Sequence, residues 1–247
     1  MKIGLVGAGH IGTTLARTLA AAGHDVKVAN SRGPDSVAAK VLETGARAVT
    51  VEGALADVDV AILSIPQVAF AGVRDLVAAL PDETVVIDTS NYFPQRDGEN
   101  TAIEAGQVES EWVSAYFGRP ITKAWNAIGT DSFKHRPQLK GHPDRVAVPV
   151  AGDRARDREI GIALMNDTGF DGFDAGPLAE SWRQQPGSPV YCTDLTYDEV
   201  APALAAAERD RLPKRRDLSV LVFGERLGGG VSPDWQSGVK ISRALFM

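Results

Sequence analysis

The stretch KIGLVGAGHIG at residues 2–12 decides the fold of this chain. Its first half is mostly apolar and predicts a buried strand, and apolar residues after the glycines recur at helical spacing. The glycines form a G-x-G-x-x-G element, which in this strand-to-helix context predicts a dinucleotide site. Gly7 permits the tight turn, Gly9 lets the backbone approach a pyrophosphate, and Gly12 lets the helix pack against the strand. The helix N-terminus would then offer N–H groups to the phosphates, and a tight turn without a ligand is the alternative.

Apolar runs that alternate with helical patterns continue along the chain. Val- and Ile-rich runs separated by helices predict parallel strands joined by right-handed crossovers. The sequence therefore predicts an α/β fold with a doubly wound, mostly parallel Rossmann-type sheet and a small C-terminal extension. The later predicted strands are residues 25–29, 48–51, 58–63, 84–87, 121–125, 146–151 and 170–174, and the main predicted helices begin at Pro34, Pro66 and Asp153.

The chain changes character after residue 178, which divides it into two predicted domains. Residues 1–178 form the dinucleotide-binding Rossmann domain. Residues 179–247 form an extension that is expected to cover the active site or a dimer interface. Its segments are a loop-like stretch at 181–196, an Ala-rich helical stretch at 198–211, a charged break at 213–217 and a tail from Gly228 with no predicted element.

Composition and charge exclude several classes of protein. The chain has 247 residues, a net charge of −6 and no apolar run near the roughly 18 residues that a membrane span requires. Nucleic-acid binding usually accompanies a basic excess, so no nucleic-acid partner is expected. Cys192 is the only cysteine, which excludes an internal disulfide and a cysteine-rich metal site. The N-terminus lacks a signal-peptide pattern, so we expect a cytoplasmic protein with no membrane partner and no metal.

The end of the second predicted strand indicates which dinucleotide binds. NAD sites usually place Asp or Glu there, about 20 residues beyond the glycines, to bond the ribose 2′-hydroxyl. This chain has Asn30, Ser31 and Arg32 instead. A carboxylate would repel a 2′-phosphate, whereas an amide, a hydroxyl and a guanidinium can all donate to it. The sequence therefore predicts NADP(H) as the cofactor, and a solvated turn is the alternative.

Further loops follow strands of the same predicted parallel sheet. Loops after parallel strands emerge at one edge, beside the glycine loop, which is where ligands bind in doubly wound sheets. We therefore expect residues 64–66, 90–91 and 125–126 to surround the nicotinamide and form an acceptor pocket, closed by Trp182, Gln184, Gln185 and Tyr191 of the extension. Each loop could instead merely cap the next helix. The predicted cofactor contacts are Gly7, Gly9, His10, Ile11, Gly12, Asn30, Ser31, Arg32, Ser64, Ile65, Pro66, Ser90, Asn91 and Ala124.

The catalytic residues are less well indicated. A carbonyl or imine acceptor needs a proton donor near the nicotinamide. Lys123, Asn126 and His10 are the candidates at this edge, with Asp88 as a further ionisable group. Because no His-Asp or Ser-x-x-x-Lys set is present, an acceptor that needs little acid catalysis, such as a flavin or deazaflavin, fits better.

These motifs together resemble the coenzyme F420-dependent NADP oxidoreductase family. The resemblance implies a Rossmann fold and NADP(H) contacts from Thr13, Ser31 and Arg32. It also implies hydride exchange with F420 or a flavin and a homodimer. Residues 123–126 are more similar to a broader bacterial group of dinucleotide-binding enzymes. The motifs that carry the resemblance are residues 7–12, 30–32, 64–66, 150–153 and 168–178.

Three functions are compatible with the sequence. The first is an NADPH-dependent reductase of F420, a flavin or a small organic acceptor. The second is an imine or β-hydroxyacid reductase, although these enzymes usually append a helical domain of more than about a hundred residues, and about 70 follow residue 178 here. The third is a non-catalytic module that senses NADP(H). Oxidation of NADPH upon addition of an acceptor would separate the enzymes from the sensor.

Overall fold

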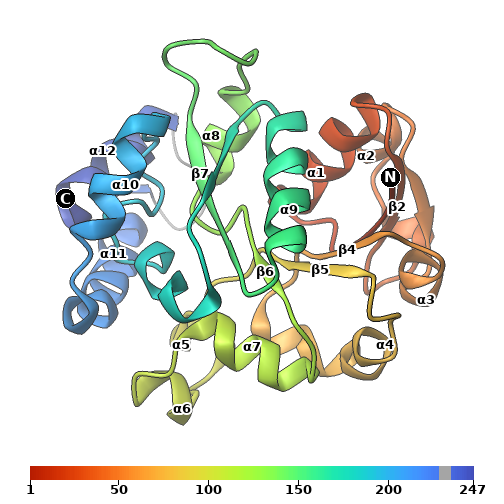
Figure 1. Cartoon of the computed structure of the whole chain (residues 1–247), viewed down its shortest axis with the longest axis horizontal. Helices are drawn as coiled ribbons and strands as arrows, with labels where there is room; N and C mark the ends of the chain where they lie inside the picture. The colour runs from red at the N-terminus through yellow and green to blue at the C-terminus, as the bar shows by residue number, and fades with distance from the viewer. Residues whose placement is uncertain (228–234) are drawn as a thin grey trace.

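The computed structural model describes residues 1–227 and 235–247, and in this part of the chain eight strands form one sheet in the order β3-β2-β1-β4-β5-β6-β7-β8 (Figure 1). The order reverses between β1 and β4, where ligands bind in doubly wound sheets. The strands are β1 (Lys2–Val6), β2 (Asp25–Ala29), β3 (Arg47–Val49), β4 (Val60–Leu63), β5 (Val85–Asp88), β6 (Thr122–Lys123), β7 (Ala147–Gly152) and β8 (Asp171–Asp174).

The predicted fold class is confirmed, with one reversal within the sheet. Every pairing from β3 across to β6 is parallel. Strand β7 pairs antiparallel with β6, with Thr122 opposite Gly152 and Lys123 opposite Ala151. Because β8 pairs parallel with β7, both strands run against the rest. The turn at 152–153 therefore lies at the edge opposite the glycine loop.

Helices cover both faces of the sheet, which explains the uninterrupted apolar runs of its central strands. In β4, Val60 and Ile62 belong to one core cluster and Ala61 and Leu63 to the other. The first cluster includes residues of α1, α8 and α9, and the second includes residues of α3, α4 and α7. The helices are α1 (His10–Ala21), η1 (Pro34–Ser36), α2 (Ala39–Leu42), α3 (Val51–Leu55), η2 (Gln67–Gly72), α4 (Arg74–Ala78), α5 (Pro94–Asp97), α6 (Thr101–Glu104), α7 (Glu109–Phe117), α8 (Thr130–His135), α9 (Ala155–Asp167), η3 (Leu178–Gln184), α10 (Tyr197–Ala205), η4 (Arg209–Arg211), α11 (Leu212–Leu227) and α12 (Trp235–Phe246).

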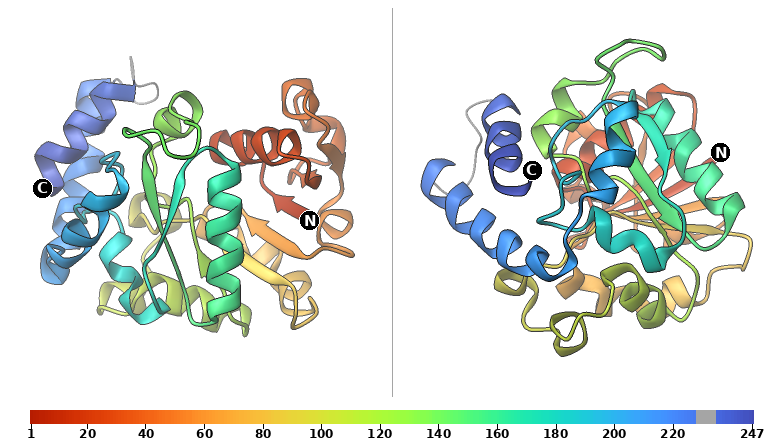
Figure 2. Two further views of the ribbon diagram at one scale, coloured as in Figure 1. Left: turned by 45° about the horizontal axis from the view of Figure 1, so that its top comes forward. Right: turned by 60° about the vertical axis from the view of Figure 1, so that its left-hand side comes forward.

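The described elements from η3 to α12 lie beside the antiparallel end of the sheet, far from β3 (Figure 2). The predicted break at 213–217 is wrong, because α11 runs through it and Pro213 is tolerated in a first helical turn. Helix α12 forms in the tail for which no element was predicted, and residues 228–234 of that tail lie outside the described residues. The helix predicted from Pro66 is split into η2 and α4. Among the described helices, none has the length and apolar character needed to cross a membrane.

Candidate functional site

A cavity of about 350 Å³ lies at the edge of the sheet where the glycine loop meets the ends of β4, β5 and β6. Predicted contacts from three separate loops line it, and two residues of the extension close its other side. Trp125 and Cys192, which both line it, have left-handed φ angles of 55° and 56°. Such angles are uncommon outside glycine and cluster at functional sites. The predicted residues that line the cavity are Gly9, His10, Ile11, Ser64, Ile65, Pro66, Ser90, Asn91, Trp125, Asn126 and Tyr191.

The three glycines of the loop are required for different reasons. Gly7 has a φ of +109°, and a Cβ there would lie 2.2 Å from the carbonyl oxygen of Ser64. A Cβ on Gly12 would lie 2.0 Å from the carbonyl oxygen of Gly7. A Cβ on Gly9 would meet no atom of the described residues within 4 Å, and the φ of Gly9 is an ordinary −72°. The fold therefore requires Gly7 and Gly12, whereas at Gly9 the backbone borders open space of the kind a pyrophosphate would fill.

The N-terminus of α1 is suited to bind an anion. Gly9 is its N-cap residue, and within the described residues no side chain caps it. Free N–H groups and the positive end of the helix dipole favour phosphate oxygens. A dinucleotide pyrophosphate thus fits the residues present.

Asn30, Ser31 and Arg32 follow β2, the strand beside β1, where the 2′-phosphate contacts are predicted. The turn is closed by the N–H of Gly33, which donates to the carbonyl oxygen of Asn30 at 3.0 Å. Arg32 is exposed and makes no hydrogen bond or ion pair with the part of the chain that the structure describes. Its guanidinium is therefore available to an anionic ligand. These contacts stay predictions.

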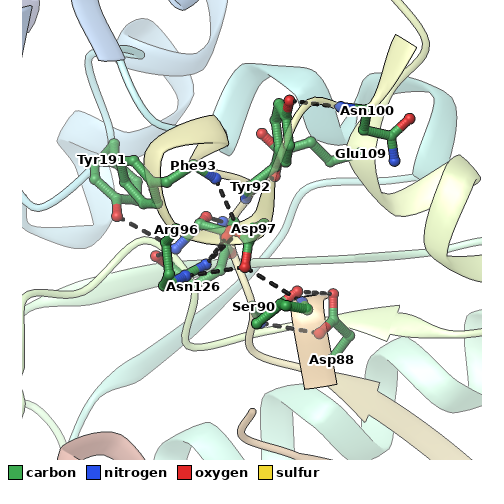
Figure 3. A network of polar contacts seen from close by, with 12 residues as sticks. Asp88, Ser90, Tyr92, Phe93, Arg96, Asp97, Asn100, Glu109, Asn126 and Tyr191 are labelled. Atoms are coloured by element: carbon green, nitrogen blue, oxygen red, sulfur yellow. Dashed lines mark hydrogen bonds and ion pairs between the residues drawn. The ribbon is translucent and has the colours of Figure 1, made fainter. Parts of the chain in front are cut away.

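A buried ion pair supports the start of the loop that follows β5. Lys123 Nζ lies 2.6 Å from Asp88 Oδ2, and both side chains are almost completely buried. The N–H of Ser90 donates to Asp88 Oδ1 at 2.9 Å, and the Ser90 hydroxyl donates to Asp88 Oδ2 at 3.1 Å. Lys123 also donates to the carbonyl oxygen of Ser90. The pair thus fixes the backbone at the edge of the cavity, and Figure 3 shows the bonds between Ser90 and Asp88.

Three further charged side chains hold the rest of this loop. The N–H of Tyr92 donates to Glu109 Oε2 at 3.0 Å, and the N–H of Phe93 donates to Asp97 Oδ2 at 3.1 Å. Arg96 donates to the carbonyl oxygen of Asn91 and pairs with Asp97 at 2.8 Å. Together with Asp88 and Lys123, these groups bind the backbone of every residue from 90 to 93, and Figure 3 shows Phe93 and Arg96 beside Asp97. The cavity wall is therefore pre-organised.

Glu109 provides a test of this support at different pH values. Burial raises the pKa of Glu109, against the opposing attraction of Lys123 and hydrogen bonds from Gln185 and Tyr92. The folded state thus holds this proton more tightly than the unfolded chain does, so the contribution of Glu109 to stability is full at acid pH and is lost as the pH rises through the raised pKa. Glu109→Gln keeps an acceptor for the Tyr92 N–H, and because glutamine does not ionise, its stability is not lost as the pH rises. We expect urea unfolding to show a gain in stability over wild type at pH 7.5 and little difference at pH 4. A loss at pH 7.5 would mean that the ionised carboxylate is stabilising.

A cluster of three amide side chains joins the loops on opposite sides of the cavity. Asn126 Nδ2 donates to Asn91 Oδ1 at 3.1 Å and to the carbonyl oxygen of Gln184 at 2.9 Å. Gln184 Nε2 donates to Asn126 Oδ1 at 2.9 Å. Asn91 Nδ2 donates to the carbonyl oxygen of Asn126 at 2.9 Å and to the hydroxyl of Tyr191 at 3.3 Å. The amide of Asn126 therefore connects the β5 and β6 loops to the extension.

The three catalytic candidates occupy different environments. Lys123 lies behind the cavity wall, paired with Asp88, and does not line the cavity. Ala124, a predicted cofactor contact, is also buried behind it. Asn126 lines the cavity, but its side-chain amide is bound to other amides. His10 lines the cavity with an exposed side chain, so it is free to approach a ligand.

Several cavity residues were not among the predicted cofactor contacts and catalytic candidates. Arg96 and Phe93 follow the β5 loop, and Thr130 follows the β6 loop. Tyr191 and Cys192 reach the cavity from the extension, in which Tyr191 was expected to close the pocket. Trp182 does not line the cavity: it packs elsewhere with Val108 and Leu212. Residues 93–96 directly follow a predicted loop, so extending that loop by a few residues would have found them.

Comparison with known proteins relates the N-terminal part of the chain to a known family. Residues 2–92 match the family described as NADP oxidoreductase, coenzyme F420-dependent. The family resemblance of the N-terminal region is thereby confirmed. The protein YjhV from Escherichia coli (strain K12) is 42% identical over 83 residues, which are 32% of this chain and 61% of YjhV. The chain thus spans less than two thirds of the length of that relative.

Two solved structures resemble the greater part of the chain. The hypothetical protein SMa0349 from Sinorhizobium meliloti has a TM-score of 0.66 at 29% identity, covering 79% of this chain and 95% of that one. A proposed F420-dependent NADP reductase from Arthrobacter sp. FB24 has a TM-score of 0.60 at 17% identity, covering 92% of this chain and 95% of the other. At 17% identity the second likeness shows the fold alone.

Proposed function

We propose that this protein is an NADPH-dependent oxidoreductase that transfers hydride between NADP(H) and an organic acceptor bound in the cavity. The observation that carries the proposal is the open space at Gly9, which directly adjoins a cavity lined by three loops of the same sheet edge. A structural turn would have no need of glycine at that position. A site for a pyrophosphate does need glycine there, because the protein backbone must approach the phosphates closely.

Different residues of the proposed site bind different parts of the cofactor. The N-terminus of α1 holds the pyrophosphate, and Ser31 and Arg32 hold the 2′-phosphate. Residues 64–66 and Ser90 border the ring that, when bound, supplies or accepts the hydride. The glycine loop and the Ser64 loop meet at the cavity, so the reacting end of the cofactor would face the acceptor there.

The acceptor is proposed to be F420, a flavin or a small organic compound. The family match over residues 2–92 supports F420 as the first compound to test. Residues 1–178 would form the NADP-binding domain and residues 179–247 the extension that covers the site. Tyr191 and Cys192 of the extension line the cavity, which supports that division. A cytoplasmic homodimer remains part of the proposal.

The cofactor preference gives a direct test. We expect NADPH to bind at least about tenfold more tightly than NADH, a difference of about 1.4 kcal/mol. Arg32→Ala should weaken NADPH binding by about 1.5–3 kcal/mol, the range for a hydrogen bond to a charged group, and leave NADH binding unchanged. Fluorescence titration measures both affinities. Arg156→Ala, which removes an exposed arginine at the opposite edge of the sheet, is the matched control. Equal affinities of the wild type for the two cofactors would refute the assignment.

The enzymatic part of the proposal has its own test. NADPH oxidation is followed by absorbance with F420, flavin mononucleotide, and a panel of small ketones, aldehydes and imines. Turnover with any of them supports an enzyme and identifies the acceptor class. Tight NADPH binding without oxidation by any acceptor would instead support a sensor of NADP(H).

A further inference from the structure

Tyr191 brings a phenol from the C-terminal extension to the candidate cavity. It lies in the loop after η3, lines the cavity and is only half-buried. Its ring meets that of Phe246 in α12 with the centroids 6.2 Å apart. The close view shows its hydroxyl directed toward the amide cluster that includes Asn126 (Figure 3). The Tyr191 ring thus packs against Phe246, while its hydroxyl reaches the cavity.

The amide cluster determines the direction of the hydrogen bond at this hydroxyl. Backbone carbonyls can only accept, so the bond from Asn126 Nδ2 to Gln184 fixes the orientation of the Asn126 amide. The bond from Asn91 Nδ2 to the carbonyl oxygen of Asn126 fixes Asn91 in the same way. Asn91 Nδ2 must then be the donor to Tyr191 Oη, 3.3 Å away. The oxygen of Tyr191 therefore accepts there, and its own hydrogen is directed elsewhere.

The other neighbour of this hydroxyl is a weak partner. The side chain of Cys192 is within hydrogen-bonding reach of Tyr191 Oη. Burial raises the pKa of the Cys192 thiol to about 12, so it stays neutral. A neutral thiol is a weak acceptor, and a ligand oxygen or nitrogen would displace it. Burial also raises the pKa of Tyr191, so the phenol keeps its proton throughout the physiological range.

Most other polar groups around the cavity either donate their protons to acceptors within the protein or cannot release them. The Ser90 hydroxyl donates to Asp88, and the Thr89 hydroxyl donates to the carbonyl oxygen of Leu63. Arg96 cannot give up a proton at any physiological pH. Lys123 lies behind the wall. Among the described residues with a titratable proton at the cavity, this leaves His10 beside the glycine loop and Tyr191 and Cys192 on the extension. Of the two extension residues, Tyr191 is held with its oxygen accepting from Asn91, so its own proton can be donated to a ligand.

We propose that Tyr191 is the proton donor of the reaction and that the acceptor is a small compound with a C=O or C=N bond. The inference rests on the proposed function and narrows its acceptor class. The acceptor carbon gains a hydride, with both electrons, from the reduced nicotinamide, which is thereby oxidised. The acceptor oxygen or nitrogen takes the Tyr191 proton and becomes O–H or N–H. The phenolate regains a proton from water, to which this half-buried side chain is accessible.

Replacing Tyr191 with phenylalanine tests the proposal by removing the hydroxyl and keeping the ring. With the carbonyl or imine acceptor that wild type reduces, we expect kcat to fall by about 100-fold or more, the usual contribution of a general acid. NADPH affinity and thermal stability should change little. Tyr197→Phe is the matched control, since Tyr197 is an exposed residue with its ring against Phe173, and it should keep the wild-type rate.

The outcomes distinguish the two proposals. If wild type binds NADPH and reduces no acceptor, the proposed function fails. If wild type reduces a carbonyl or imine and Tyr191→Phe keeps its rate, or if F420 and flavins are the only compounds reduced, the inference about Tyr191 fails and the oxidoreductase stands. If circular dichroism shows that Tyr191→Phe is unfolded, the following measurement tests the proposal instead.

A measurement without turnover tests the placement of Tyr191. The protein is labelled with 3-fluorotyrosine, and the ¹⁹F resonance of residue 191 is identified by its loss in Tyr191→Phe or, if that variant does not fold, in Tyr191→His. NADP⁺ and NADPH differ in the charge of the nicotinamide ring, so exchanging one for the other should move this resonance. The resonance of Tyr197 should stay in place. A residue-191 resonance that is identical with the two cofactors would overturn the proposal.

Discussion

Gly9→Val is expected to abolish NADPH binding while the protein keeps its fold. The position has an ordinary φ of −72°, and a Cβ there meets no described atom within 4 Å, so the protein leaves room for a side chain to start there. Its side chain would fill the space proposed for the pyrophosphate and prevent the close approach of the backbone. Fluorescence titration with NADPH and circular dichroism measure the two effects.

Gly12→Ala is the control that separates the fold from the ligand. Its Cβ would lie 2.0 Å from the carbonyl oxygen of Gly7, so α1 must move even when no cofactor is present. We expect this variant to lose thermal stability, in contrast to Gly9→Val. If Gly9→Val binds NADPH as strongly as wild type, the phosphates bind at some other place.

Lys123→Met is expected to destabilise the protein by about 3–5 kcal/mol, because it leaves a buried carboxylate without its partner. The Asp88 carboxylate is fully buried, and the ammonium of Lys123 lies 2.6 Å from it. Ser90 would still donate to Asp88, but two neutral donors do not replace a cation. Urea unfolding at neutral pH measures the loss. Cofactor affinity should fall as well, because the backbone of Ser90 loses a donor.

Two further variants check the cause of this loss. Lys123→Met combined with Asp88→Asn removes both charges and should recover a large part of the stability. Lys2→Met breaks an exposed pair with Asp57 and should have little effect. A loss in Lys123→Met no larger than that in Lys2→Met would show that the buried pair contributes little.

The central part of the fold could be predicted because its signals are local. The strand at 25–29 is found with the predicted bounds, and the helix predicted from Asp153 forms as Ala155–Asp167. Val- and Ile-rich runs and strand-to-helix glycines depend on neighbouring residues only. The reversal of β7 is not local, because nothing within 146–151 specifies whether the neighbouring strand runs parallel or antiparallel. The continuous helix through Pro213 was missed because, in the sequence alone, a proline that begins a helix looks the same as a proline that interrupts one.

The same distinction between local and long-range signals holds for the site. Its cofactor half follows strand ends, so Gly9, Ser64 and Asn91 could be placed at one cavity from the order of the strands. The charged groups that hold residues 90–93 come from distant elements, and only folding brings Glu109 and Lys123 beneath the same loop. Asn126 was expected as a cavity residue, but its partners Asn91 and Gln184 are determined by packing. Long-range contacts of this kind have no periodic signal in the sequence.

The reversed strands β7 and β8 have a consequence for how the two halves of the site can vary. Because β8 ends at the edge opposite the cavity, the chain must run back along the sheet before Tyr191 reaches the site. The wall that faces the acceptor thus comes from a segment about a hundred residues beyond the loops that border the cofactor. In the site that we propose, mutations in that segment could alter the choice of acceptor while residues 7–32 keep the same cofactor. A family of such proteins could then share one coenzyme and differ in the compounds that it reduces.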